Sequence, residues 1–299
     1  IQEAFRNKYG LSVDIVSGSG PGLQERLKTE SRSRNMVADV VEGNVTNAVN
    51  MKADGLTMPY GTLPILKENG DWTINPRIDP DGHILYYSPQ FNPLWINTKL
   101  VKQGDEPHAW SELTQSKWKD KIIANDPALL QLLDQFYVVM VKRGLLSQEY
   151  FVSLGKQGIK RTYPAQNGQA TLARGEGQVA LLLSDSTTAI FVQQGAPIRP
   201  VDMEEGIPAQ SLAFALVKDN PHPNASTLFA NWLLAQEGQN IYARARAVLP
   251  IRKDVSDYRP EGVKIQYKKP IVYTIQELEE GAKAFLERRL NGLWTSQAK

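Results

Sequence analysis

The sequence predicts an α/β fold with mainly parallel sheets, arranged as two lobes joined by a hinge. Three observations indicate it: short apolar strands alternate with helices, polar or glycine-rich turns follow the strands, and two proline-rich segments interrupt the pattern. At 299 residues, the chain is long enough for about two domains. If the segments 75–93 and 197–208 are both crossings, the middle of the chain is inserted into a domain built from both ends.

The individual elements follow from hydrophobic pattern and capping residues. Residues 1–10 have the pattern of the second half of a helix that ends in a glycine C-cap at Gly10. Asp126 is predicted to cap a helix that starts with Pro127, and Thr274 to open the last helix in a capping box with Glu277. Further helices are predicted from residue 23 and over 46–53, 224–236 and 274–290. Strands are predicted at 11–15, 38–41, 122–124, 179–183 and 211–217.

Composition and motif searches exclude several classes of function. The 34 basic and 32 acidic residues nearly balance, which gives no electrostatic reason to bind nucleic acid or anionic lipid. The chain has no cysteine, which excludes disulfides, thiolate metal sites and cysteine nucleophiles. No apolar run approaches the roughly 18 residues that a membrane span needs. The three histidines, His83, His108 and His222, lack the spacing of metal ligands, so we expect them in surface loops.

Catalytic and cofactor motifs are equally absent. Leu23 occupies the third glycine position of a dinucleotide fingerprint, and no Gly-x-Ser-x-Gly elbow occurs. The sequence therefore predicts no cofactor, no bound metal and no catalysis. Tyr86 and Tyr87 could supply phenolate ligands to a hard metal, but adjacent strand residues face opposite ways, which favours packing near the hinge.

Three polar turns follow predicted strands and are candidate ligand sites. They are the glycine-rich turn with Ser17, Gly18, Ser19 and Gly20, the pair Asn125 and Asp126, and the run Ser184, Asp185, Ser186 and Thr187. Each turn alone is compatible with simple helix capping or with exposed N–H groups that bind an anion. In open α/β sheets, ligands bind beyond the carboxyl ends of strands, where all three turns are predicted to lie.

Several segments resemble those of bacterial extracellular solute-binding proteins. Residues 109–122 are similar to the family's W-x-D-L-x-x-P-x-W-K-G-K-I segment, and Lys218-Asp-Asn-Pro-His-Pro-Asn-Ala225 is similar to its "PHPnAA" stretch. Residues 38–40, 174–180, 233–239 and 248–252 agree with further family segments. The nearest branch contains binding proteins for ferric iron, phosphonates, sugar phosphates and polyamines.

The resemblance implies a type II periplasmic binding protein fold whose two lobes close on a small solute. Lobe I is expected to comprise residues 1–91 and 209–262, and lobe II residues 92–208 and 263–299. The expected partners are the solute and the permease of an ABC importer, and no nucleic acid. A periplasmic monomer is expected, whose signal peptide and first strand are absent from this sequence.

The residues at the expected site depart from the iron-binding pattern. Iron-binding members carry paired tyrosines after the strand that corresponds to 179–183, where this chain has Ser184-Asp-Ser-Thr187. Their carboxylate ligand aligns near Asn44, with Glu42 two residues away, so the resemblance adds Glu42 and Asn44 to the candidates. Since ferric iron prefers several anionic oxygens, a small polar or anionic solute is expected instead: an organic acid, a phosphonate or a phosphate ester.

Alternatives remain on the same residues. Asp185 opposes a highly charged anion unless it points away or caps its own helix, and Glu42 and Asp185 together could hold an amine, as in polyamine binding. Ferric iron is a further alternative ligand. Other classes are the effector-sensing domain of a transcription regulator and a hydrolase or lyase that uses Glu42 and Asp185.

Overall fold

The computed structural model describes residues 1–18, 20–67 and 78–295, and the chain divides into two compact units. Unit 1 comprises Ile1–Gln90 and Ser211–Tyr258, and unit 2 comprises Phe91–Gln210 and Arg259–Lys299. The chain thus crosses between units after residues 90, 210 and 258. The lobe boundaries expected from the sequence lie after residues 91, 208 and 262. The first predicted crossing, 75–93, lies partly outside the described residues, and its later part contains strand β3 (Leu85–Phe91).

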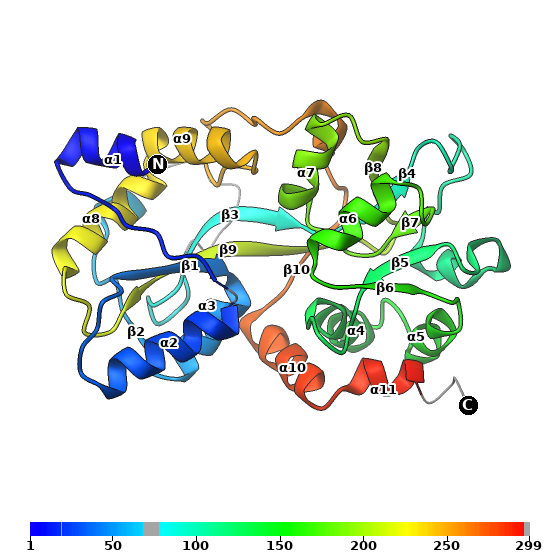
Figure 1. The fold of residues 1–299 in the computed structure, drawn as a ribbon, viewed down its shortest axis with the longest axis horizontal. Helices are drawn as coiled ribbons and strands as arrows, with labels where there is room; N and C mark the ends of the chain where they lie inside the picture. The colour runs from blue at the N-terminus through cyan, green and yellow to red at the C-terminus, as the bar shows by residue number, and fades with distance from the viewer. Residues whose placement is uncertain (19, 68–77, 296–299) are drawn as a thin grey trace. The chain divides into compact units, whose positions relative to one another are not determined.

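Unit 1 is built on residues 211–217 of the long strand β9 (Ile207–Val217), whose residues are buried at all but one position (Figure 1). The antiparallel strand β1 pairs with the C-terminal part of β9, and β2 and β3 also pair with β9. The other elements are α1 (Gln2–Tyr9), α2 (Gly20–Arg32), β1 (Val40–Asn44), α3 (Val45–Ala53), β2 (Thr57–Met58), η1 (Pro64–Lys67), α8 (Pro223–Leu234) and α9 (Gln236–Arg246).

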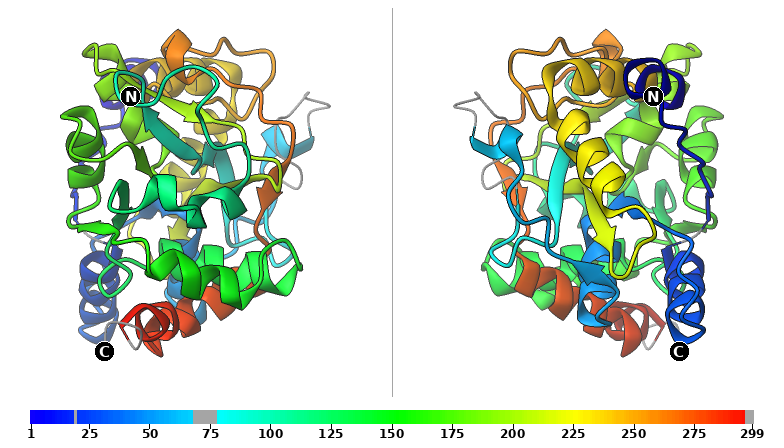
Figure 2. Two further views of the ribbon diagram at one scale, coloured as in Figure 1. Left: turned by 90° about the vertical axis from the view of Figure 1, so that its right-hand side faces the viewer. Right: turned by 90° about the vertical axis from the view of Figure 1, so that its left-hand side faces the viewer.

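The core of unit 1 lies where β3 and β9 meet α8 and α9, the two helices drawn in yellow in Figure 2. Tyr87 of β3 is fully buried there, with its ring centroid 5.1 Å from that of Tyr242 of α9 and 6.4 Å from that of Phe214. These edge-to-face contacts hold both tyrosines in fixed positions.

Unit 2 contains a five-stranded sheet in the order β6-β5-β7-β4-β8, while β10 pairs with residues 207–209 of β9. Its strands are β4 (Leu94–Asn97), β5 (Ile122–Asn125), β6 (Lys160–Thr162), β7 (Val179–Ala180), β8 (Ile198–Val201) and β10 (Pro270–Val272). Its helices are η2 (Trp110–Thr114), η3 (Ser116–Trp118), α4 (Leu132–Lys142), α5 (Gln148–Gly155), α6 (Gln166–Ala173), α7 (Asp185–Gln193), η4 (Glu261–Val263), α10 (Ile275–Leu286) and α11 (Arg289–Thr295).

Helix α10 packs along α4 with very close backbones (Figure 1). A Cβ at Gly281 would lie 2.7 Å from Cγ and 2.9 Å from Cα of Gln135 on α4. Arg143 at the end of α4 donates to both carboxylate oxygens of Glu277, at 2.8 and 2.7 Å. Although burial opposes ionisation, the Arg143 guanidinium and the Thr274 N–H lower the pKa of Glu277 to about 2.

The structure confirms the α/β class but corrects the expectation of mainly parallel sheets. In unit 2, β5 pairs in parallel with β6 and β7, whereas β4 pairs antiparallel with β7 and β8. In unit 1, β1 and β2 both run antiparallel to β9. The first strand of unit 2, β4, lies between β7 and β8 and runs opposite to both, so this sheet is mixed.

Four predicted elements also differ. Residues 11–15 form no strand, and Asp126 caps a turn at 127–129 rather than a helix, since α4 begins only at Leu132. The strand predicted at 179–183 is reduced to Val179–Ala180, and the helix predicted at 274–290 ends at Leu286, before α11. The capping box of Thr274 with Glu277 and the left-handed C-cap at Gly10 are confirmed. Among the described residues, no helix combines the length and apolar character that a bilayer crossing requires.

We expect Gly281→Ala to lower the free energy of unfolding by about 1–3 kcal/mol, because the new methyl group collides with the backbone of α4. Gly292→Ala is the matched control: this glycine lies in α11 with nothing within 4 Å of an added Cβ, so alanine should stabilise by about 0.4–1 kcal/mol. Urea unfolding of both variants measures the difference. Equal effects would contradict the close approach of α4 and α10.

Candidate functional site

Asp185 is buried inside unit 2, where it joins three separate segments. Its Oδ1 accepts hydrogen bonds from the backbone N–H groups of Phe91, at 3.1 Å, and Ser186, at 2.9 Å. Its Oδ2 accepts one from Nη1 of Arg259 at 3.0 Å, and both side chains of this ion pair are at most 4% exposed. Burial raises the pKa of Asp185 to about 6, and Arg259 and the two N–H groups oppose this rise, so the carboxylate is charged at neutral pH.

The hydroxyl side chains next to Asp185 are more exposed than its carboxylate. Ser184 is the N-cap of α7, and its Oγ lies 3.0 Å from Oγ of Ser186. Thr187 is exposed, and its Oγ1 lies 3.0 Å from the side-chain amide of Gln169 on α6. The run 184–187 therefore directs its only charge inward, to Arg259, and leaves hydroxyl groups at the N-terminus of α7.

Asn125 ends β5 and is buried beside this region, with its Oδ1 accepting from Thr162 Oγ1 at 3.3 Å. Gly168 of α6 allows a close approach: an added Cβ would lie 3.4 Å from that same Oδ1 and 2.9 Å from Leu183. Asp126 uses its Oδ1 to cap the Ala128 N–H at 2.9 Å, and Arg161 lies 3.8 Å away. Asn125 and the 184–187 run thus flank α6, whereas Asp126 is engaged in its own turn.

In unit 1, the glycine-rich turn leads into α2, which packs against the start of α3. Ser17 and Gly18 are exposed, and Ser19 lies outside the described residues. Gly20 begins α2, and an added Cβ there would lie within 2.6 Å of Cγ of Asn47 on α3. Asn44 accepts a hydrogen bond from the Asn47 N–H at 3.0 Å and caps α3. The structure thus brings the turn and Asn44 together at adjoining helix N-termini.

Glu42 belongs to a second group in unit 1, which the sequence did not predict. The hydroxyl groups of Tyr87 and Tyr242 both donate to Oε1 of Glu42, the second at 3.2 Å. Arg246 lies one turn after Tyr242 on α9. Its electrostatic interaction with Tyr242, and to a smaller extent with Glu42, raises the pKa of Arg246. The spacing of Tyr242 and Arg246 is the one local signal that could have revealed part of this group.

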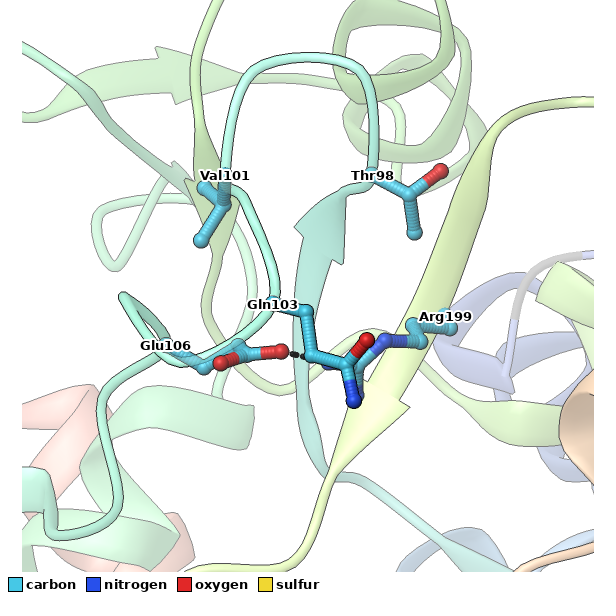
Figure 3. Close-up of a pocket in the computed structure, with 5 residues that line it drawn as sticks. All are labelled: Thr98, Val101, Gln103, Glu106 and Arg199. Atoms are coloured by element: carbon cyan, nitrogen blue, oxygen red, sulfur yellow. Dashed lines mark hydrogen bonds and ion pairs between the residues drawn. The ribbon is translucent and has the colours of Figure 1, made fainter.

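A further polar pocket lies in unit 2. Its volume is about 370 Å³, and Glu106 and Arg199 pair with each other in its lining (Figure 3). Within the described part of the chain, no three His, Asp or Glu side chains are placed to hold a metal ion. His108 and His222 are exposed as expected, whereas His83 is half-buried, with Nδ1 2.9 Å from Thr57 Oγ1.

Comparison with solved structures shows the same fold in several binding proteins. The chain aligns with a ferric binding protein from Campylobacter jejuni at 16% identity and a TM-score of 0.79, covering 99% of this chain and 94% of that one. Iron-bound HitA from Pseudomonas aeruginosa aligns at 18% identity and 0.78, with 97% and 94% covered. The periplasmic binding protein AfuA from Actinobacillus pleuropneumoniae, with fructose-6-phosphate bound, aligns at 20% and 0.71, with 97% and 91% covered.

The fold is therefore that of periplasmic binding proteins, as the sequence predicted. The family model of bacterial extracellular solute-binding proteins matches residues 1–270. The chain belongs to this family, whose members bind substrates for transport.

We expect Asp185→Ala to lower the free energy of unfolding by about 3–5 kcal/mol, because it removes a buried carboxylate that pairs with Arg259 and accepts two backbone hydrogen bonds. The control is Glu261→Ala, which removes the carboxylate of an exposed pair with Lys264 in the same unit and should change stability little. Guanidinium unfolding measures both. A similar small effect for both variants would refute the anchoring role of Asp185.

We also expect Gly20→Ala to destabilise the wild-type chain by about 1 kcal/mol, since Asn47 must move its side-chain amide away from the new Cβ. The same substitution in an Asn47→Ala background should cost less. A double-mutant cycle by thermal unfolding gives the coupling, which should exceed about 0.5 kcal/mol. Additive effects would mean that α2 and α3 do not meet at Gly20.

Proposed function

We propose that this protein is the periplasmic solute-binding component of an ABC importer and that it binds a small polar or anionic solute. Family membership over residues 1–270 supports the solute-binding role. The inward-facing carboxylate of Asp185 supports the solute class, because it leaves the N-terminus of α7 without an exposed negative charge.

The start of α7 supports an oxyanion as part of the solute. Ser184, Ser186 and Thr187 carry hydroxyl groups at this end, although Thr187 Oγ1 also donates to the Ser184 carbonyl at 3.3 Å. The helix dipole favours negative charge there. Asp185 was the residue that opposed an anion in the sequence. Arg259 balances the charge of Asp185, so this carboxylate does not oppose a bound anion. For the same reason, Asp185 is not suited to hold an amine together with Glu42.

Three of the alternatives that the sequence left open, ferric iron, polyamines and a hydrolase or lyase, fit less well. Ferric iron and polyamines are cations, and both would meet the guanidinium of Arg246 beside Glu42. The pair Glu42 and Asp185 also gives little support to a hydrolase or lyase, since Asp185 is buried in its ion pair and lies in the other unit.

The test is a ligand-dependent thermal shift with a panel of phosphate esters, phosphonates, carboxylates, putrescine and ferric citrate. Binding only to the folded state at 100 times Kd stabilises by about 2.7 kcal/mol, which gives a clear rise in Tm. We expect anionic organic solutes to raise Tm and Thr187→Ala to weaken their binding about tenfold through the loss of one hydrogen bond. Thr295→Ala, an exposed threonine bonded within its own helix, is the control.

Native mass spectrometry of protein purified without refolding identifies any solute that copurifies. A copurified organic anion agrees with the proposal. Stabilisation by ferric iron or putrescine, with no response to any anion, would overturn it.

A further inference from the structure

The carboxylate of Glu42 is held by two buried phenols. Tyr87 and Tyr242, 0% and 5% exposed, both place their hydroxyl groups against Oε1. The two hydroxyl oxygens lie 3.1 Å apart. Glu42 itself is exposed at the middle of β1, where its backbone pairs with Phe214 of β9. A mobile surface carboxylate is thereby held in one orientation.

A count of protons shows which oxygen remains available. Burial raises the pKa of Tyr87 and of Tyr242 far above the usual value of a phenol, so each hydroxyl keeps its one hydrogen. These two hydrogens serve three contacts, two to Oε1 and one between the phenols. Neither reaches Oε2, and among the described residues no other group donates a hydrogen bond to that oxygen. Oε2 is a fixed acceptor at the protein surface.

A cation accompanies this acceptor. Arg246 is the last residue of α9, four positions after Tyr242, so both side chains lie on the same face of the helix. The guanidinium of this exposed side chain interacts electrostatically with Tyr242 and with Glu42. Unit 1 therefore presents an oriented hydrogen-bond acceptor with a cationic donor near it.

We propose that Glu42 and Arg246 together bind a solute that carries an amine or hydroxyl group next to an acid group, with the donor on Glu42 Oε2 and the acid on Arg246. Tyr87 and Tyr242 are positioning residues that fix the carboxylate. This inference rests on the proposed function and specifies its substrate class: amino- or hydroxy-substituted organic acids.

Each half of the site rejects the simpler ligands. A plain cation is repelled by Arg246, and a plain anion is repelled by Glu42. Only a solute with both groups satisfies both side chains. A site built to accept a hydrogen bond discriminates strongly against an analogue that lacks the donor, because a polar group is then left unpaired.

The test uses solutes matched in size that differ in one group. The carboxylate set is 3-aminopropanoate, 3-hydroxypropanoate and butanoate, and the phosphonate set is 2-aminoethyl-, 2-hydroxyethyl- and propylphosphonate. Propan-1-amine lacks the acid. Isothermal titration with the full chain should show at least one amine or hydroxyl member binding about tenfold or more tightly than its methyl analogue, and no binding of propan-1-amine.

Variants separate the roles of the four residues. Glu42→Gln should reduce the preference for the donor-bearing solute, and Arg246→Gln should weaken every acid. Tyr87→Phe and Tyr242→Phe should lower the ratio between donor and methyl analogue, which a loss of stability alone does not change. Tyr86→Phe, half-buried on the same strand, and Arg244→Gln, exposed on the same helix, are matched controls that should keep the wild-type ratio.

The outcomes distinguish this inference from the proposed function. If acids bind but the methyl analogues bind as well as the donor-bearing ones, the inference is wrong and the proposed function stands. If Tyr86→Phe changes the ratio as much as Tyr87→Phe and Tyr242→Phe do, the positioning role is wrong. If no acid of either set binds and putrescine does, both the inference and the proposed function are overturned.

Discussion

The buried carboxylate of Asp185 is the interaction on which the candidate surface of unit 2 depends. It binds the N–H of Phe91 and the guanidinium of Arg259, the first residues of the two segments that enter this unit. It also binds the N–H of Ser186 in the first turn of α7. One side chain therefore fixes both incoming segments against the helix whose start carries the hydroxyl groups. Burying a charged carboxylate costs free energy, and the hydrogen bonds from these three donors offset that cost.

Local signals in the sequence were enough for most elements, because they act within one helix or strand. The capping box at Thr274 and the glycine C-cap at Gly10 are short-range devices, and the structure contains both. The strand predicted from the alternation in residues 11–15 was wrong, because a strand also needs a partner and this segment pairs with none of the described strands. The helix start predicted at Asp126 was also wrong, because an Asp side chain that accepts a backbone hydrogen bond can open either a turn or a helix.

The candidate site was less predictable, because its contacts join distant parts of the chain. The sequence shows that Asp185 and Ser186 are neighbours. It does not show that Asp185 forms an ion pair with Arg259, 74 positions later. Similarly, Glu42 and Tyr242 are 200 positions apart, so their hydrogen bond leaves no local pattern. The family resemblance placed Glu42 in the site without its two phenols. Only the four-residue spacing of Tyr242 and Arg246 was readable beforehand.

The two acids that the sequence grouped together are treated in opposite ways by the fold. Asp185 is turned inward and neutralised, so its surroundings present hydroxyl groups and a helix N-terminus to solvent. Glu42 is turned outward and held by phenols, so its charge stays available beside a cation. Proteins with this fold include ferric binding proteins and one solved with fructose-6-phosphate, so the backbone arrangement does not determine the ligand. The orientation of each acid, set by its buried partners, is the feature that can differ while the fold is kept.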